Sequence, residues 1–268
     1  MFRTAIRMAP ISASEIPSLN LLYKLDRLDV SRLGPLKGAS PAYNDRIGLF
    51  RGDITTLSVD AIVNAANTSL LGGGGVDGAI HRAAGPKLLA ECRTLGGCPT
   101  GASKITDAYK LPCKKVIHTV GPVYDDTHPA VSEAALRDCY RSSLELAVKS
   151  GLKTIAFSAI STGVYGYPSL DAAHVACDTV RKYLGTGDGE ALDKVIFVTF
   201  EEKDVRAYNH LLPRHFPPST PSTNDHDQLT KEQNAEAEAR ASQLPNVPST
   251  DPADPEHALK KQKQGDKK

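Results

Sequence analysis

The sequence has no closely spaced cysteine pair, no long apolar run and no excess of one charge, and each absence excludes a class of protein. Its five cysteines are an odd number, and none follows the C-x-x-C spacing of a zinc site or a redox motif. No apolar run is long enough to span a bilayer, so no membrane contact is predicted. The formal net charge of +1 gives no bulk attraction toward nucleic acid. The composition favours reduced thiols in a reducing compartment.

Residues 217–268 lack aromatic side chains. They hold seven prolines and only four branched aliphatic residues, so they cannot bury enough apolar surface to offset the entropy of ordering. We predict a disordered tail rich in proline and charge over residues 217–268. The rest divides into an N-terminal extension, partly helical, over residues 1–43 and one domain over residues 44–216.

The two ends of the chain carry weak signs of a cellular address. Residues 1–14 contain two arginines and no acid, which resembles a mitochondrial presequence, and a lysine cluster ends the tail as either a nuclear-import signal or plain solvated charge. The expected location is cytoplasmic or nuclear, with a mitochondrial one as the alternative. A monomer is the default oligomeric state.

Short apolar runs alternate with amphipathic ones through the domain, a pattern typical of alternating strands and helices. The strand runs are nearly continuous and β-branched, as expected for strands that helices cover on both faces. We predict an α/β fold, a three-layer α/β/α sandwich with a mixed, mostly parallel central sheet of about six strands. Strands are expected at residues 47–51, 61–65, 104–108, 116–120, 154–159 and 194–200, and helices at 78–84, 86–95, 129–150, 169–184 and 205–212.

A run of four glycines, residues 72–75, stands between a predicted strand and a predicted helix. Glycine loses more conformational entropy on folding than any other residue. Ordering four glycines in a row therefore costs more free energy than an ordinary surface turn requires. They let backbone N–H groups approach a ligand closely, at the start of a helix that favours anions. Asp77 follows at the rim of this anion cradle, where its side chain either caps the helix or acts on the bound anion.

A second glycine-bearing loop, residues 161–166, follows another buried apolar run. In open α/β sheets ligands bind beyond the carboxyl ends of strands, so two such loops suit a diphosphate. Gly73, Gly75 and Gly78 match G-x-G-x-x-G, but residues 67–71 separate them from the strand and Glu91 lies in a helical pattern, which argues against a dinucleotide fingerprint. No Gly-Lys-Ser/Thr follows, which excludes a Walker A loop.

Five blocks of sequence, in order, resemble the macrodomain family and within it the MacroD-type branch of ADP-ribosyl hydrolases. They are GDI at residues 52–54, VDAIVNAAN at 59–67, LLGGGGVDGAIHRAAG at 70–85, KITDAYKLP with VIHTVGP at 104–122, and ISTGVYGYP at 160–168. The resemblance covers residues 44–216 and implies a macrodomain-like fold that binds ADP-ribose and mono-ADP-ribosylated proteins.

The resemblance also implies which residues hold the ligand. Asp53 and the Ile54 N–H would meet the adenine, although Asp53 also suits a turn cap. Phe200 would contact adenine, with an ordinary core aromatic as the alternative. Asn67 would hold the distal ribose and Tyr165 would pack it, while Asn64 has a structural place. The diphosphate would lie between two groups of residues: Gly74, Gly75 and Val76 on one side, and Ser161, Thr162, Gly163, Val164 and Tyr165 on the other.

The chemistry expected of this site is water attack on an ester of ADP-ribose. Asp77 would orient or deprotonate the water, helped by a substrate phosphate, and Asn67 would share the catalytic role. His81, one helical turn after Asp77, is expected to be structural or to support Asp77, and His118 to be a satisfied core histidine. No group of residues shows metal-ligand spacing, so neither a metal nor another cofactor is predicted.

Two functions of different class remain open. The first is a hydrolase that removes mono-ADP-ribose from Glu- or Asp-modified proteins and deacetylates O-acetyl-ADP-ribose. The second is a reader module that binds ADP-ribose without turnover. The presence of Asn67, Asp77 and Tyr165 together favours the hydrolase. A nucleic-acid-binding domain would need a basic face with exposed aromatics, which the near-neutral charge does not support.

Overall fold

A computed structural model of the chain describes residues 9–28, 30 and 34–219. Most of the presequence-like stretch (residues 1–8), the lysine cluster and nearly all of the expected tail (220–268) lie outside the described residues. The limits of the three predicted segments stay predictions.

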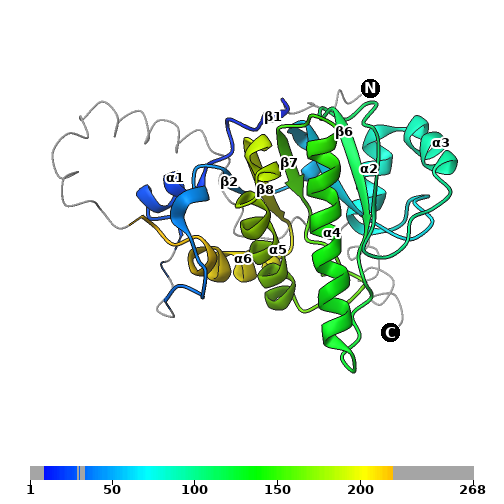
Figure 1. Cartoon of the computed structure of the whole chain (residues 1–268). Coiled ribbons are helices and arrows are strands. Elements are labelled where there is room, and N and C mark those ends of the chain that lie inside the picture. The colour runs from blue at the N-terminus through cyan, green and yellow to red at the C-terminus, as the bar shows by residue number, and fades with distance from the viewer. Residues whose placement is uncertain (1–8, 29, 31–33, 220–268) are drawn as a thin grey trace, which may run out of the picture. The chain divides into compact units, whose positions relative to one another are not determined.

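The centre of the fold is a six-stranded sheet in which every neighbouring pair is parallel except one (Figure 1). Strand β5 runs antiparallel to β6, so the sheet is mixed and mostly parallel, as predicted. In spatial order the strands are β2 (Ile47–Arg51), β8 (Lys194–Thr199), β7 (Thr154–Phe157), β4 (Ala61–Ala66), β6 (Lys115–Val120) and β5 (Ser103–Asp107). A separate parallel pair joins β1 (Ile11–Ser12) to β3 (Leu57–Ser58).

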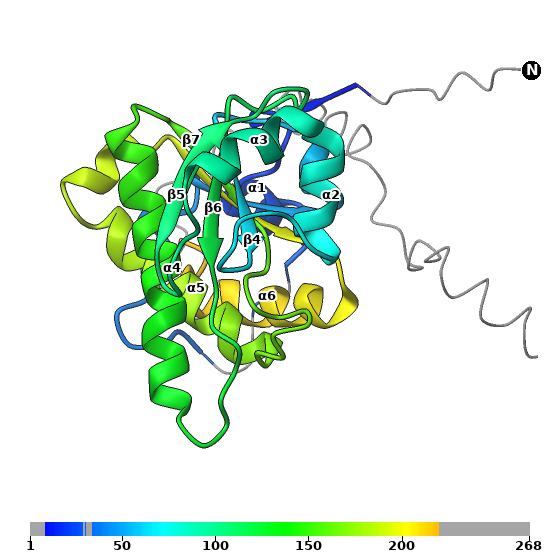
Figure 2. The ribbon, with the colours of Figure 1, turned by 90° about the vertical axis from the view of Figure 1, so that its right-hand side faces the viewer.

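Helices cover both faces of this sheet, which confirms the three-layer arrangement (Figures 1 and 2). Alternate residues of β4 divide between two apolar clusters: Ala61 and Val63 face one side, and Ile62 and Ala66 the other. One cluster lies under α4 (Pro129–Lys149), α5 (Ser169–Leu184) and α6 (Glu202–His215). The other lies under α2 (Gly75–Ala84) and α3 (Pro86–Thr94).

The predicted elements exist, and their ends shift for local reasons. Helix α2 begins at Gly75, three residues earlier than predicted, because the last glycine of the run takes part in the first turn. Helix α6 extends to His215 and includes Pro213, whose ring the last turn accommodates. Val131 in the first turn of α4 is exposed, whereas the next residue, Ser132, is buried.

The N-terminal segment packs on the outer strand β2. Ser18 caps the short helix α1 (Leu19–Lys24), and Leu19 and Leu22 enter the core cluster. Ser18 forms an antiparallel bridge with Gly48 of β2. The Tyr23 hydroxyl donates to the Phe216 carbonyl at 2.6 Å and so ties this segment to the end of α6. Among the described residues, no helix combines the length and apolarity needed to cross a membrane.

Asp178 on α5 is the centre of a cluster of ion pairs that joins α4 to α5. Its carboxylate is 2.7 Å from Arg137, 2.8 Å from Arg181 and 2.8 Å from Lys182. Burial raises the pKa of Asp178, but the hydrogen bonds from these cations outweigh burial and hold the pKa well below its usual range. The ionised form therefore stabilises the fold.

We expect Asp178→Asn to lower the free energy of unfolding by about 1–3 kcal/mol at pH 7. Because the folded-state pKa is depressed, the contribution is complete above the unfolded-state pKa of about 3.9, begins to decline below it and is lost only as pH falls through the folded-state pKa. Urea unfolding of both proteins at pH 7 and pH 3.5 measures this. Asp138→Asn, which removes an exposed pair with Arg141, is the control and should change stability by less than about 1 kcal/mol. A difference from wild type that does not shrink at low pH would contradict the assignment.

Candidate active site

The predicted site residues gather at one edge of the sheet, beyond the carboxyl ends of its parallel strands. Asp53 follows β2, Phe200 follows β8, Ser161 follows β7 and Asn67 follows β4. Because neighbouring strands lie side by side in the order β2, β8, β7, β4, these four positions follow one another along the edge. Chain segments more than a hundred residues apart therefore contribute to one linear site.

Asn67 holds the glycine loop in shape. Its Nδ2 donates to the Gly72 carbonyl at 2.9 Å, and its Oδ1 accepts from the Ser69 N–H at 3.0 Å and the Ser69 hydroxyl at 2.6 Å. Gly72 and Gly75 have φ angles of +87° and +58°, which glycine adopts without strain. Asn67, predicted to contact the distal ribose, thus also has a structural task within the loop.

The loop lies directly against helix α2. A Cβ on Gly78 would lie 2.5 Å from the Gly73 carbonyl oxygen, whereas one on Gly74 would meet nothing within 4 Å. The N-cap of α2 is Gly74, with no side-chain hydrogen bond to the helix. The first N–H groups of α2 therefore have no side-chain cap, and this end carries the positive pole of the helix dipole.

Asp77 does not cap α2, so the simple N-cap interpretation was wrong. It is the third residue of the helix, only 4% exposed, and accepts a hydrogen bond from Asn64 Nδ2 at 2.8 Å. Its other oxygen, Oδ2, is buried without a hydrogen-bond partner among the described residues and lies 3.2 Å from where a Gly73 Cβ would be. Burial raises the pKa of Asp77, while the Asn64 hydrogen bond and His81, 3.4 Å away, act in the opposite direction.

Asn64 belongs to a row of polar side chains that crosses three strands under α2 and α3. Asn64 of β4 pairs in register with His118 of β6, and Asn64 Nδ2 lies 3.1 Å from His118 Nδ1. His118 Nε2 lies 2.9 Å from the Thr106 hydroxyl on β5. Burial, with a smaller effect of His81, lowers the pKa of His118 to about 3, so the ring is neutral.

The hydrogen bonds of this row fix its proton positions. An ionised Asp77 requires the Asn64 NH₂ group, which then also donates to His118 Nδ1, so the His118 proton resides on Nε2 and points to Thr106. The prediction that His118 is a satisfied core histidine is confirmed. The direct contact between Asn64 and Asp77 was not predicted. Its signal was the period of two that places a polar residue between Ile62 and Ala66 on one strand face.

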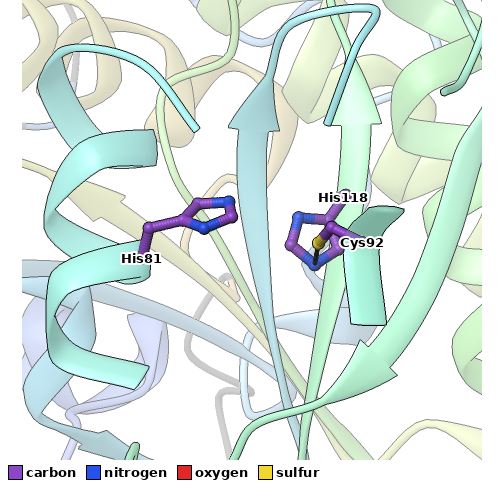
Figure 3. A group of neighbouring side chains, drawn as sticks. All are labelled: His81, Cys92 and His118. Carbon is purple, nitrogen blue, oxygen red and sulfur yellow. Dashed lines mark hydrogen bonds between the residues drawn. The ribbon is translucent and has the colours of Figure 1, made fainter. Parts of the chain in front are cut away.

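Cys92 on α3 completes a cluster with two histidines. Its Sγ lies 3.8 Å from His118 Nε2, and one ligand atom each of His81, Cys92 and His118 lies within 4.8 Å of the others (Figure 3). Sequence spacing did not indicate this group because its members come from α2, α3 and β6.

The second loop is held by the start of α6. Lys203 Nζ donates to the Thr162 carbonyl at 2.5 Å, and the Thr162 hydroxyl donates to Asp204 Oδ2 at 3.1 Å. Ser161 has a φ of +67° and a buried Oγ without a partner among the described residues, and Val164 is 99% exposed. Gly163 and Val164 therefore lie exposed at the surface on a fixed base.

The structure shows the surroundings of two further predicted site residues. Asp53 does cap a turn: it is the N-cap of a 3₁₀ helix, and its Oδ1 accepts from the Thr55 N–H at 2.9 Å. Phe200 is 57% exposed, so the core interpretation was wrong. The Gly52 N–H donates to the Thr199 carbonyl at 3.0 Å, which holds the ends of β2 and β8 together.

Comparison with known proteins adds a consistent likeness. Residues 63–176 match the model of the family described as Macro domain. The chain is 55% identical to ADP-ribose glycohydrolase MACROD2 of Xenopus laevis over 65% of this chain and 41% of that protein, so it spans less than half of that relative. It is 57% identical to a macro domain-containing protein of Chlorobaculum tepidum over 63% of this chain and 96% of that protein. The Trypanosoma brucei macrodomain in complex with ADP-ribose is 44% identical, with a TM-score of 0.64 over 76% of this chain and 77% of that one.

The contact between Gly78 and Gly73 yields a test of the loop. We expect Gly78→Ala to lower the free energy of unfolding by about 1–3 kcal/mol, because the added Cβ must push the loop backbone away from α2. Gly74→Ala is the matched control in the same glycine run and should stay within about 1 kcal/mol of wild type. Thermal unfolding of both variants compares them, and equal stabilities would show that the loop does not depend on this contact.

Proposed function

The chain belongs to the macro domain family, and from that premise we propose that it is a hydrolase that binds ADP-ribose and removes it from mono-ADP-ribosylated proteins. The observation that carries the proposal is the Asp77 carboxylate. One oxygen is held by Asn64, and the other is buried, unpartnered among the described residues and close to the glycine loop. A carboxylate arranged in this way is suited to hold a water at the loop.

The order of the strands supports a definite placement of the ligand. Adenine would lie over Asp53, the Ile54 N–H and Phe200, where β2 and β8 end. The distal ribose would lie near Asn67 and Tyr165, three strand spacings away, which is about 14 Å. The two loops would hold the diphosphate between them, and its anionic oxygens would meet the exposed backbone of Gly74, Gly75 and residues 163–165. The uncapped N-terminus of α2 supports this placement, because its dipole favours negative charge.

The reaction assigned to Asp77 is a water attack on the ester that joins the anomeric carbon of ADP-ribose to a Glu or Asp side chain. The water oxygen bonds to the anomeric carbon as the carbon–oxygen bond to the protein breaks, and the protein carboxylate leaves with the bonding electrons. The water proton passes to Asp77 Oδ2 or to a phosphate oxygen. The raised pKa of Asp77 suits this transient acceptance of a proton. The same water would serve O-acetyl-ADP-ribose by attack on its acetyl ester.

We expect Asp77→Ala to release ADP-ribose from a glutamate-linked, mono-ADP-ribosylated protein at least about 100-fold more slowly than wild type. Its affinity for ADP-ribose should change only a few-fold, because the loops that hold the diphosphate remain. Asp171→Ala is the matched control, since Asp171 is likewise the third residue of a helix, α5, but is exposed. Product release is followed by chromatography and affinity by calorimetry.

The same measurements separate the two functions. A wild-type chain that binds ADP-ribose and releases none would be a reader, and the hydrolase proposal would then be wrong. An Asp77→Ala variant that turns over as fast as wild type would remove Asp77 from the chemistry.

A second prediction concerns adenine. We expect Phe200→Ala to weaken ADP-ribose binding about 5- to 20-fold, because an exposed aromatic ring would lose its contact with the base. Tyr109→Ala is the control: Tyr109 is an exposed aromatic that follows β5, at the opposite edge of the sheet. Calorimetry with ADP-ribose and with ribose 5-phosphate distinguishes the contacts. Equal losses for both ligands would contradict an adenine role.

A further inference from the structure

We propose that His81, Cys92 and His118 form a binding site for a divalent cation of the Zn²⁺ class, buried under α2 and α3 beside Asp77. The three side chains come from three different elements, and one ligand atom of each lies within 4.8 Å of the others (Figure 3). Two imidazoles and a thiolate are a donor set that Zn²⁺ accepts readily.

The distances are close to those of a loaded site. With bonds of about 2.0–2.3 Å, the ligand atoms of a tetrahedral Zn²⁺ site lie roughly 3.3–3.8 Å apart. Cys92 Sγ and His118 Nε2 already lie 3.8 Å apart. All three ligand atoms lie within 4.8 Å of one another, so we assign the remaining adjustment to a turn of His81 toward the other two. His81 is the member best able to move, because its side chain is 12% exposed while Cys92 and His118 are fully buried.

The surroundings offer a further ligand and an approach. Asp77 Oδ1 lies 3.4 Å from His81 Nε2, so the carboxylate is within reach of an ion bound to that ring. Cys92 also forms part of the wall of an open cavity of about 400 Å³, together with Thr68 and Leu71 at the outer side of the glycine loop. We assign the approach of an ion to this side, where the wall must open because Cys92 itself is fully buried.

Binding would exchange protons in a defined way. Burial raises the pKa of the Cys92 thiol to about 11, so the S–H proton leaves to solvent as the Zn–S bond forms, with no change of oxidation state. His118 must offer the lone pair of Nε2, so its proton moves from Nε2 to Nδ1 and the bond to the Thr106 hydroxyl is lost. The N–H on Nδ1 then requires an acceptor from Asn64.

Asn64 couples the proposed metal site to Asp77. Its Oδ1 is buried without a partner among the described residues, and a rotation of the amide by half a turn would present this oxygen to the Nδ1–H of His118. The same rotation withdraws the NH₂ group from Asp77 Oδ1. Binding of a cation would therefore break the hydrogen bond that Asn64 donates to Asp77. If Asp77 acts as the proposed function states, occupation of the site slows the hydrolase.

Cobalt is the direct probe of the site, because a thiolate bound to Co²⁺ gives an intense charge-transfer absorption. We expect the full chain to show this band on titration with Co²⁺ and to lose it when Zn²⁺ is added. Cys92→Ala should lose the band. Cys98→Ala, which removes another buried free thiol, should keep it. Circular dichroism confirms that both variants fold. No band in the wild type, or a band unchanged in Cys92→Ala, would overturn the proposal.

Thr106→Val tests whether the metal binds His118 through Nε2, and here the expected change is a gain of metal affinity. The hydroxyl holds His118 Nε2 in the metal-free state, so its removal should tighten Co²⁺ and Zn²⁺ binding about tenfold. An unchanged or weaker affinity would show that the metal does not take Nε2 from Thr106, and would remove His118 from the site.

The consequence for activity is measured separately. Zn²⁺ at a concentration that saturates the Co²⁺ site should inhibit release of ADP-ribose by the wild type at least about tenfold, and Cys92→Ala should keep its activity in the same Zn²⁺. Equal inhibition of both proteins would overturn the coupling through Asn64. If the wild type has no hydrolase activity, the cobalt spectrum still decides the metal site, so the two proposals fail independently.

Discussion

A carboxylate that is buried away from water needs a hydrogen-bond donor. For Asp77 on α2 that donor is the side-chain amide of Asn64, on the inner strand β4. The orientations of the neighbouring polar side chains follow from this contact. Asn64 can donate to Asp77 only while its amide has one orientation, and a neutral His118 with its proton on Nε2 stabilises that orientation. Thr106 in turn accepts from Nε2. A connected polar row of this kind fixes its own geometry, while Asn64 Oδ1 and Asp77 Oδ2 stay buried without partners among the described residues.

The loops at the sheet edge show a division of labour between side chains and backbone. Side chains such as Asn67, Thr162 and Lys203 bind the loops to the domain from within. The glycines 73–75, with Gly163 and Val164, are exposed at the surface. Phosphate groups suit main-chain donors, because N–H groups at a helix start are fixed in direction and need no side-chain entropy. The arrangement fits a ligand that is long, anionic at its centre and aromatic at one end.

The fold could be read from the sequence more completely than the site. Continuous β-branched runs and the amphipathic run over residues 129–150 depend on local patterns, and the structure contains the corresponding strands and α4. The place of Asp77 at a glycine-rich helix start was also visible locally. Its partners were not, because Asn64 meets His118, 54 residues later, only through the pairing of β4 with β6, and His118 meets Thr106 only through the pairing of β6 with β5. Cys92 looked incidental for the same reason, and Phe200 could not be placed because exposure at a strand end depends on the neighbouring strand.

The bridge between Ser18 and Gly48 gives the N-terminal segment a protective task. Strand β2 is the first strand in the sheet order, so its outer side has no neighbouring strand, and unpaired N–H and C=O groups on such a side can recruit a strand from another molecule. Helix α1, with Leu19 and Leu22 buried in the core, lies beside this strand and occupies part of that side. A fragment shortened to begin at β2 would keep every residue of the proposed ADP-ribose site, but the unpaired backbone groups along the outer side of β2 would be exposed. We therefore expect the first helix to oppose self-association and to take no part in the chemistry.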